Sequence, residues 1–447
     1  MTRSRRPRAV AVVFALAVAM LVVAGVTITS DSRQDEPVRP GPVSGPAAAG
    51  QEPVPGADLA ATTRALQQRL DRLPGDYTAW ASLGLAYVQQ ARITGDPTYY
   101  PKAEGALENS LARRPAGNDA AHTGLASLAA ARHDFHEALR QARHAQRLNP
   151  YGAANQGVLG DALIELGRYE QAFAELQRMV DLQPGVASFT RVSYAWELRG
   201  EVGRARGALE RALDFSTTPS DAAYCLYHLG ELAWNSGQLD AAEGHYTQGV
   251  RRDPGYAPLI AGQAKVAAAR GDAELALDRY REVVRRRPEP SYVIAYAELL
   301  AALGRDERAT RQYAVVDATR RLYEAQGVRV DLEIALFDAD TGHPDAALEA
   351  ARAAWRQRRT VHTEDAYAWA LHASGRDRDA LPHARAAARL GTKSAQFAYH
   401  RGMIERALGR YGSAEAALQR ALRLNPYFSP LHAPRARAAL DDPAAAR

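Results

Sequence analysis

GRYEQA, residues 167–172, is one of eight related segments spaced along this chain at nearly regular intervals. Each segment begins with a glycine and ends, five residues later, with an alanine. Gly200 follows Gly167 by 33 residues, and Gly271 follows Gly237 by 34. A repeat of that length predicts a solenoid of helix pairs, in which each unit buries its surface only against its neighbours. The eight glycine and alanine pairs are Gly167/Ala172, Gly200/Ala205, Gly237/Ala242, Gly271/Ala276, Gly304/Ala309, Gly342/Ala347, Gly375/Ala380 and Gly409/Ala414.

The charge of the chain does not indicate binding to nucleic acid. The formal net charge is +5, but four arginines precede the first acidic residue, and from residue 31 onward 52 basic residues face 51 acidic ones. No basic stripe is visible, so no nucleic-acid partner is expected. Arginine and alanine are abundant while lysine is rare, a bias that we interpret as a genomic habit of actinobacterial type. The single cysteine, Cys225, excludes an intramolecular disulfide and a cysteine metal cluster.

The N-terminus has the features of a membrane anchor. An uncharged run follows the four arginines from Ala9 to Thr29, and about 20 such residues are enough to span a bilayer. The arginines should stay cytoplasmic. We therefore expect residues 1–30 to be a signal-anchor or transmembrane segment, single-pass in the cell membrane, with the bulk of the chain extracytoplasmic. A cleaved signal peptide and a secreted protein remain the alternative. Residues 31–57 hold six prolines and are expected to form a linker.

A second pattern lies inside each period. The first unit has Trp80, Leu83, Gly84 and Tyr87, followed by an alanine, a large apolar residue and a closing proline. These units resemble the tetratricopeptide repeat (TPR) family. We count about ten of them, of which four, around 187–217, 290–320, 328–359 and 361–391, lose the closing proline or the early Leu-Gly. The other matching residues are Ala103, Leu107, Pro115, Leu125, Ala126, Ala138, Ala142, Pro150, Leu159, Gly160, Ala172, Leu176, Pro184, Leu229, Gly230, Ala242, Tyr246, Pro254, Ala264, Ala276, Tyr280, Pro288, Gly402, Ala414, Leu418, Ala421 and Pro426.

The resemblance implies an all-α fold, a right-handed superhelical solenoid of antiparallel helix pairs over residues 58–432, with a C-terminal capping tail at 433–447. Small residues such as Gly84 and the alanines should let paired helices approach closely. The glycine after each first helix suits the left-handed conformation of a helix C-cap. The proline ends each second helix because it cannot continue the hydrogen-bond ladder.

In this family the first helices line the concave face, which implies two candidate groups of groove residues. The first lies on one helix: Tyr224, Tyr227, His228, Glu231 and Trp234. The second is centred on His362, Asp365, Trp369 and His372, whose spacing of three, four and three residues places them on one helix face. Neighbouring units add Glu333, Tyr399, His400, Met403 and Arg406 to this second group.

Three interpretations of these groups compete. In the first, the tryptophans pack into neighbouring units and the histidines are half-exposed polar residues. In the second, the residues form a peptide-binding groove with aromatic anchors. In the third, histidine and carboxylate side chains hold a metal ion. His362 and His372 are ten residues apart, about 15 Å along a helix, too far for one ion. A metal site would therefore need a residue of the next unit.

Signals for catalysis are weak. No phosphate-loop or dinucleotide motif follows a strand, and no strand is expected. Cys225 and His228 lie one helical turn apart and could be written as a nucleophile pair, but a small buried packing residue is the favoured interpretation of Cys225. The charged clamp with which some family members hold an acidic C-terminal carboxylate needs lysines and asparagines that this chain lacks. We expect neither an enzyme nor a cofactor nor a receptor for acidic tails.

The sequence thus favours a membrane-tethered, extracytoplasmic scaffold that binds a protein or peptide of the cell envelope in its concave groove. The alternative is an accessory protein for metal or small-molecule handling at the membrane, which would use a histidine-rich groove in the C-terminal units.

Overall fold

The computed structural model describes residues 59–328 and 331–442. The chain divides into two units, 1–47 and 48–447, and all described residues belong to the second. The anchor expected at residues 1–30 and the linker expected at 31–57 lie outside the described residues. Within the described part, no helix is long and apolar enough to cross a membrane.

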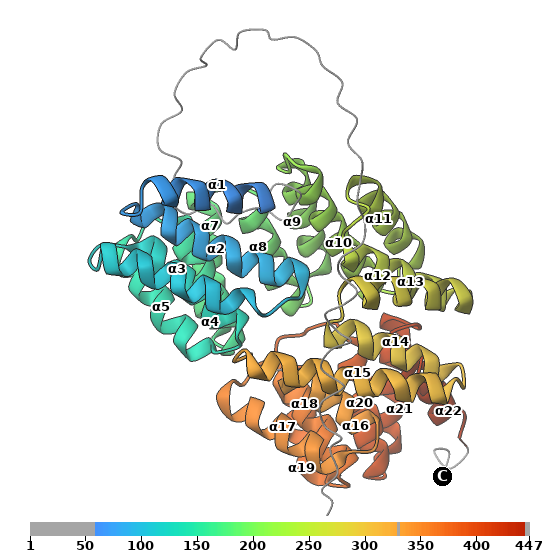
Figure 1. The fold of residues 1–447 in the computed structure, drawn as a ribbon. Coiled ribbons are helices and arrows are strands. Elements are labelled where there is room, and N and C mark those ends of the chain that lie inside the picture. Colours follow the sequence, from blue (N-terminus) through green and yellow to red (C-terminus); the bar gives the residue numbers. More distant parts are fainter. Residues whose placement is uncertain (1–58, 329–330, 443–447) are drawn as a thin grey trace, which may run out of the picture. The chain divides into compact units, whose positions relative to one another are not determined.

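The described residues form 22 helices and no strands, arranged as ten successive helix pairs between α1 (Leu59–Arg72) and α22 (His432–Asp441). Each first helix makes its most extensive contacts with the second helix of its own pair. Figure 1 shows the helices following one another along the colour gradient. The first helices are α2 (Tyr77–Thr94), α4 (Asp119–Ala131), α6 (Ala153–Glu165), α8 (Val186–Leu198), α10 (Pro219–Asn235), α12 (Ala257–Ala269), α14 (Pro290–Ala302), α16 (Asp331–Asp340), α18 (Val361–Ala373) and α20 (Ala395–Ala407). The second helices are α3 (Tyr99–Arg113), α5 (Phe135–Leu148), α7 (Tyr169–Leu182), α9 (Val202–Asp214), α11 (Leu239–Arg252), α13 (Ala273–Arg286), α15 (Asp306–Ala325), α17 (Pro344–Gln357), α19 (Asp377–Ala387) and α21 (Tyr411–Leu424).

The helix boundaries follow from local sequence signals. Helix α10 begins after Thr218, whose side chain accepts a hydrogen bond from the Asp221 backbone N–H, with Pro219 in the first turn. All eight glycines of the ladder have a positive φ, between +67° at Gly304 and +86° at Gly271. This left-handed turn lets the chain reverse from the first helix of a pair to the second, so the expected role of these glycines is confirmed.

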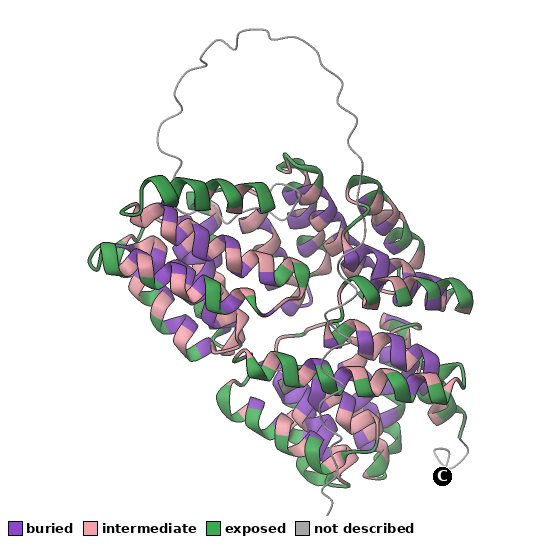
Figure 2. Ribbon diagram, in the orientation of Figure 1, coloured by how far each residue is buried: buried purple, intermediate pink, exposed green. Residues whose placement is uncertain are grey.

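Small residues on one helix of a pair face large residues on the other. A Cβ atom added at Gly84, Gly160 or Gly402 would collide with a leucine of the second helix, namely Leu107, Leu176 and Leu418 in turn. The ladder alanines, from Ala172 to Ala414, are buried where the helices meet. Figure 2 shows the buried residues on the faces that helices turn toward one another. The expected close approach of paired helices is therefore confirmed.

The array coils so that units far apart in sequence touch. Asn425 Nδ2 donates to the Trp234 carbonyl at 2.8 Å across 191 residues, and the Val361 backbone N–H donates to Tyr169 Oη at 2.9 Å across 192. The Thr392 hydroxyl donates to the Leu198 carbonyl across 194 residues. We call this line of contacts the seam. It joins the turns between the two helices of a pair, at Tyr169, Leu198 and Trp234, to segments at or before the start of a helix one turn of the coil later.

Candidate binding cavity

A cavity of about 860 Å³ lies inside the coil. One side is formed by the first helices α2, α4, α6, α8 and α10, whose inward side chains line it. The other side comes from the following turn: the junction of α13 and α14, the end of α15, α16, and the start of α18. The seam therefore shapes this space, because it sets the distance between the two walls.

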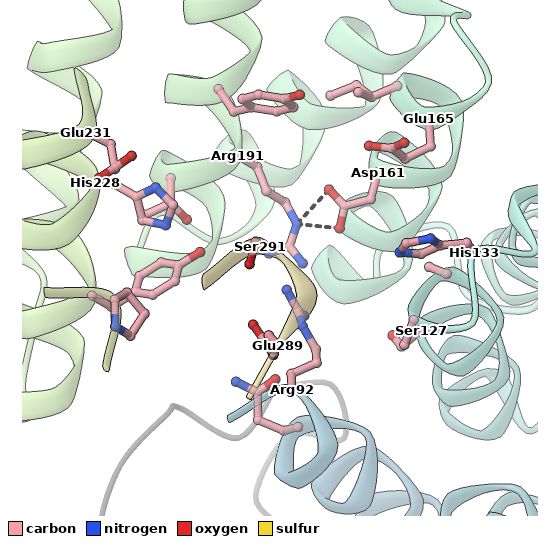
Figure 3. A pocket seen from close by; sticks show the side chains of 18 of the residues that line it. Arg92, Ser127, His133, Asp161, Glu165, Arg191, His228, Glu231, Glu289 and Ser291 are labelled. Atoms are coloured by element: carbon pink, nitrogen blue, oxygen red, sulfur yellow. Dashed lines mark hydrogen bonds and ion pairs between the residues drawn. The ribbon is translucent and has the colours of Figure 1, made fainter. Parts of the chain in front are cut away.

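Most of the charged side chains of the cavity are held in ion pairs. Arg191 Nε contacts Asp161 Oδ2 at 2.9 Å, which Figure 3 shows as dashed lines at the centre of the view. Arg287 Nη2 contacts Glu289 Oε1 at 2.5 Å, and Arg358 pairs with Glu165 across the seam. The lining contains four arginines and seven carboxylates, so carboxylates are in excess: Asp161, Glu165, Glu197, Asp221, Glu231, Glu289 and Glu333.

The carboxylates that line this space are partly desolvated. Burial raises the pKa of Glu197, a hydrogen bond from Asn235 opposes the shift, and the charge of Glu231 adds to it. Burial and the nearby Glu289 likewise raise the pKa of Glu333, against the opposing charge of Arg358. These carboxyl groups therefore hold their protons to higher pH than a solvated glutamate, and a nearby cation would favour their ionised form.

An aromatic wall lies beside the carboxylates. The rings of Tyr224 and His228 meet edge to face with centroids 4.5 Å apart, and Tyr256 and Tyr292 also line the cavity. Burial lowers the pKa of His228 to about 4, so its imidazole is neutral near neutral pH. Tyr194 is 37% exposed, yet its pKa is raised, first by burial and then by Glu165 and Glu197. Both observations follow because the ring faces the open cavity while protein atoms and carboxylates surround it.

The first group of candidate groove residues divides within α10. Tyr224, His228 and Glu231 line the cavity, and Figure 3 shows His228 and Glu231 on one wall. Glu231 also contacts Lys265 Nζ at 2.5 Å and accepts a hydrogen bond from Tyr246 Oη at 2.7 Å. Tyr227 is half-buried, with its ring packed against Tyr256. Trp234 is buried in the core beside the seam.

The second group does not form one open surface. Glu333 and His362 reach the cavity, where His362 Nε2 lies 3.4 Å from Tyr194 Oη. Asp365, Trp369, Tyr399 and His400 are buried in the C-terminal units. There the His400 ring stacks on Trp369 with centroids 4.1 Å apart, and His400 Nδ1 lies 2.9 Å from Asp365 Oδ2. These side chains fill the space between units because the helices of adjacent pairs close over them.

The remaining members of the second group have separate local partners. His372 Nδ1 contacts Asp377, Arg406 Nη1 donates to the Ala439 carbonyl at 3.0 Å, and Met403 packs against the core. Within residues 59–328 and 331–442, no three His, Cys, Asp or Glu side chains are placed to hold a metal ion. His362, His372 and His400 lie in three different surroundings: the cavity, a contact with Asp377, and the core beside Trp369.

Cys225 is a packing residue. Its side chain is buried against Phe189 and Ala212, and burial, followed by the charge of Asp221, raises the pKa of the thiol to about 12. A thiol of this kind is not ionised near neutral pH and is a poor nucleophile.

Sequence reasoning missed several cavity residues, including Arg191, Glu197, Tyr256, Arg287 and Arg358. A usable signal existed for Arg191, which stands nine residues before Gly200 as His228 does before Gly237, and for two further residues. Asp161 and Tyr194 stand six residues before their turn glycines, the same position that Glu231 holds before Gly237. Choosing this position in every unit, and not only at Glu231, would have identified Asp161 and Tyr194 as well. On the second wall, Glu333 and His362 were among the predicted groove positions. Arg287 and Arg358 lie at the ends of second helices, outside those positions, and only the coiling of the array brings them to the cavity.

A family model described as the tetratricopeptide repeat matches residues 123–187, 189–257 and 366–427. Together with ten helix pairs in the described residues, these matches show that the chain contains tetratricopeptide repeats, and repeats of this kind suggest a protein-interaction scaffold. Among curated proteins, none matches this chain.

Several solved structures are similar to parts of this chain. A thermophilic TPR protein of Thermus thermophilus is 23% identical, covers 38% of this chain and 91% of its own, and has a TM-score of 0.35. PilF of Pseudomonas aeruginosa is 20% identical over 50% of this chain and 96% of its own, with a TM-score of 0.36. Human IFIT1, solved as a dimer with PPP-AAAA, is 12% identical over 82% and 87%, with a TM-score of 0.47. All three scores are below 0.5, and the likeness says nothing about what this chain binds.

Proposed function

We propose that this protein is a membrane-tethered, extracytoplasmic interaction scaffold that holds a segment of a protein partner inside the coil. The observation that carries the proposal is the cavity of about 860 Å³, lined by the first helices of five successive units and closed by the next turn. Its volume falls in the range of about 300–1,000 Å³ that is usual for ligand pockets. Its walls combine tyrosine rings with charged groups fixed in ion pairs, and such groups can anchor a segment and set its register.

The tether is supported by the sequence alone, through the arginines before Ala9–Thr29 and the length of that uncharged run. Deletion of residues 1–30 is expected to move the protein from the membrane fraction to the soluble fraction of its host cell. The intact protein should be digested by a protease added outside the membrane; protection from that protease would contradict the proposed topology.

The cavity is tested by filling it. Short peptides that bind the full chain would be selected from a random display library, and their affinities measured by titration calorimetry. Ser291 is exposed to the cavity on the second wall, so Ser291→Trp should occupy the space without disturbing buried packing. We expect it to weaken binding of the selected peptides by at least about tenfold, or about 1.4 kcal/mol.

The matched control is Ser413→Trp, an exposed serine on α21 that does not line the cavity. Its peptide affinity should equal that of the unaltered protein. Equal affinities for both tryptophan variants would show that peptides bind elsewhere, and the proposed site would be abandoned.

A further inference from the structure

We propose that the cavity takes a polypeptide segment with a basic side chain, whose cationic group pairs with Glu197 near the tyrosines of the aromatic wall. This inference rests on the proposed function and adds the chemistry of the partner.

The first support is the excess of carboxylates over available cations. Three of the four arginines of the cavity, Arg191, Arg287 and Arg358, are already paired with carboxylates of the same lining. Glu197 accepts a hydrogen bond from Asn235 Nδ2 at 3.2 Å, a neutral donor, and has no ion pair within the described part of the chain. The charge of Glu231 acts on Glu197 and raises its pKa further. Glu231 is already paired with Lys265 Nζ at 2.5 Å, so Glu197 is the carboxylate that lacks a cation, and the space beside it favours a positive charge.

The second support is the chemistry of the wall beside them. Tyr224, Tyr256 and Tyr292 line the cavity, and Tyr292 lies close enough to Glu231 to be affected by its charge. A cation is attracted to the face of a tyrosine ring, and more strongly as water is excluded. The one histidine of this wall, His228, cannot supply the charge, because burial lowers its pKa to about 4. Carboxylates and ring faces together form a receptor for an ammonium or guanidinium group.

An acidic segment fits the same space poorly. It would need free guanidinium groups, and three of the four arginines of the lining already contact carboxylates, which leaves Arg92, whose charge acts on Glu289. It would also bring a carboxylate toward Glu197 and Glu231, where like charges repel in a partly desolvated site. A free polyamine shares the cationic chemistry of a basic side chain, and the experiment has to separate the two sources.

The test uses synthetic peptide pools of equal length that differ only at a fixed central residue: arginine, lysine, citrulline or glutamate. Binding of each pool to the full chain would be measured by calorimetry, with spermidine as a competitor. We expect the arginine and lysine pools to bind about tenfold more tightly than the citrulline and glutamate pools. Spermidine should compete weakly; if it displaces the arginine pool at equal concentration, the site is one for small polyamines and the proposal is overturned.

The contribution of Glu197 is tested with Glu197→Gln, which keeps the shape of the side chain and removes its charge. We expect the arginine pool to lose about tenfold in affinity, and the citrulline pool to change little. Glu108→Gln, an exposed position on α3 outside the cavity, should change neither.

Protonation gives an independent readout. A bound cation lowers the raised pKa of Glu197, so binding should release protons, and affinity should rise with pH while this carboxyl group ionises. Calorimetry in buffers of different ionisation enthalpy measures that release, which should fall in Glu197→Gln. If Ser291→Trp blocks peptides that show no preference for a basic residue, the charge proposal fails and the proposed function stands. If no pool binds at all, both fail.

Discussion

Replacing Tyr246 with alanine is expected to lower the free energy of unfolding by about 4 kcal/mol, the cost typical of removing a large buried ring. The ring is fully buried between two glycines of successive first helices, Gly230 and Gly262, and a Cβ atom at either glycine would overlap it. Its hydroxyl donates to Glu231 Oε1 at 2.7 Å. The alanine variant therefore leaves both a cavity between two units and a carboxylate without one of its partners.

Two control variants separate these contributions in urea unfolding. Tyr246→Phe keeps the ring and removes the hydroxyl, and it should cost about 1–3 kcal/mol, as is usual when a hydrogen bond to a charged group is lost. Tyr151 is 82% exposed, so Tyr151→Ala should leave stability unchanged within about 0.5 kcal/mol. A loss in Tyr246→Ala no greater than in Tyr151→Ala would contradict the close packing of these units.

Gly200→Ala is expected to open the seam, whereas Gly409→Ala is not. Both glycines have a φ of +72°, so both substitutions carry the same backbone strain of about 1–2 kcal/mol. They differ in surroundings. A Cβ atom at Gly200 would overlap the Gly391 carbonyl across the seam, and one at Gly409 would meet nothing within 4 Å. Because a backbone carbonyl cannot turn aside like a side chain, the seam must yield in the first variant.

The expected result is an additional loss of about 1–3 kcal/mol in Gly200→Ala relative to Gly409→Ala, as is typical of overpacking. Small-angle X-ray scattering should show a larger radius of gyration for Gly200→Ala alone, because the coil loses contacts between its turns. Equal stability and equal radius in the two variants would show that the turns do not touch at Gly200 in solution.

The repeat pattern predicted the helix pairs because each residue of the pattern meets a requirement within its own unit. Each turn glycine needs a positive φ, and each small residue, such as Gly160 opposite Leu176, is required by a neighbour within the same unit. The N-cap of α10 at Thr218 and the end of α21 before Asn425-Pro426 also depend only on neighbouring residues. Signals of this kind can be read from one unit at a time.

The seam and the cavity could not be predicted in the same way. They depend on small rotations between successive units, which add up over 191 to 194 residues before Asn425 reaches Trp234 and Thr392 reaches Leu198. No single residue determines the accumulated rotation, so it cannot be read from the sequence of one unit. The assignment of groove positions found Tyr224, His228 and Glu231 on one wall and Glu333 and His362 on the other. It also selected Asp365, Trp369 and His400, which the closing of adjacent units buries.

The central claim is that a partner segment occupies the interior of the coil, and chemical protection of Ser291→Cys tests it most directly. The native Cys225 is buried and its thiol pKa is raised to about 12, so it should not react with an alkylating reagent. Position 291 lines the cavity, and Ser413→Cys supplies an exposed control outside it. A saturating selected peptide should slow alkylation at position 291 by about tenfold or more and leave position 413 unchanged. Equal alkylation at position 291 with and without the bound peptide would contradict the account.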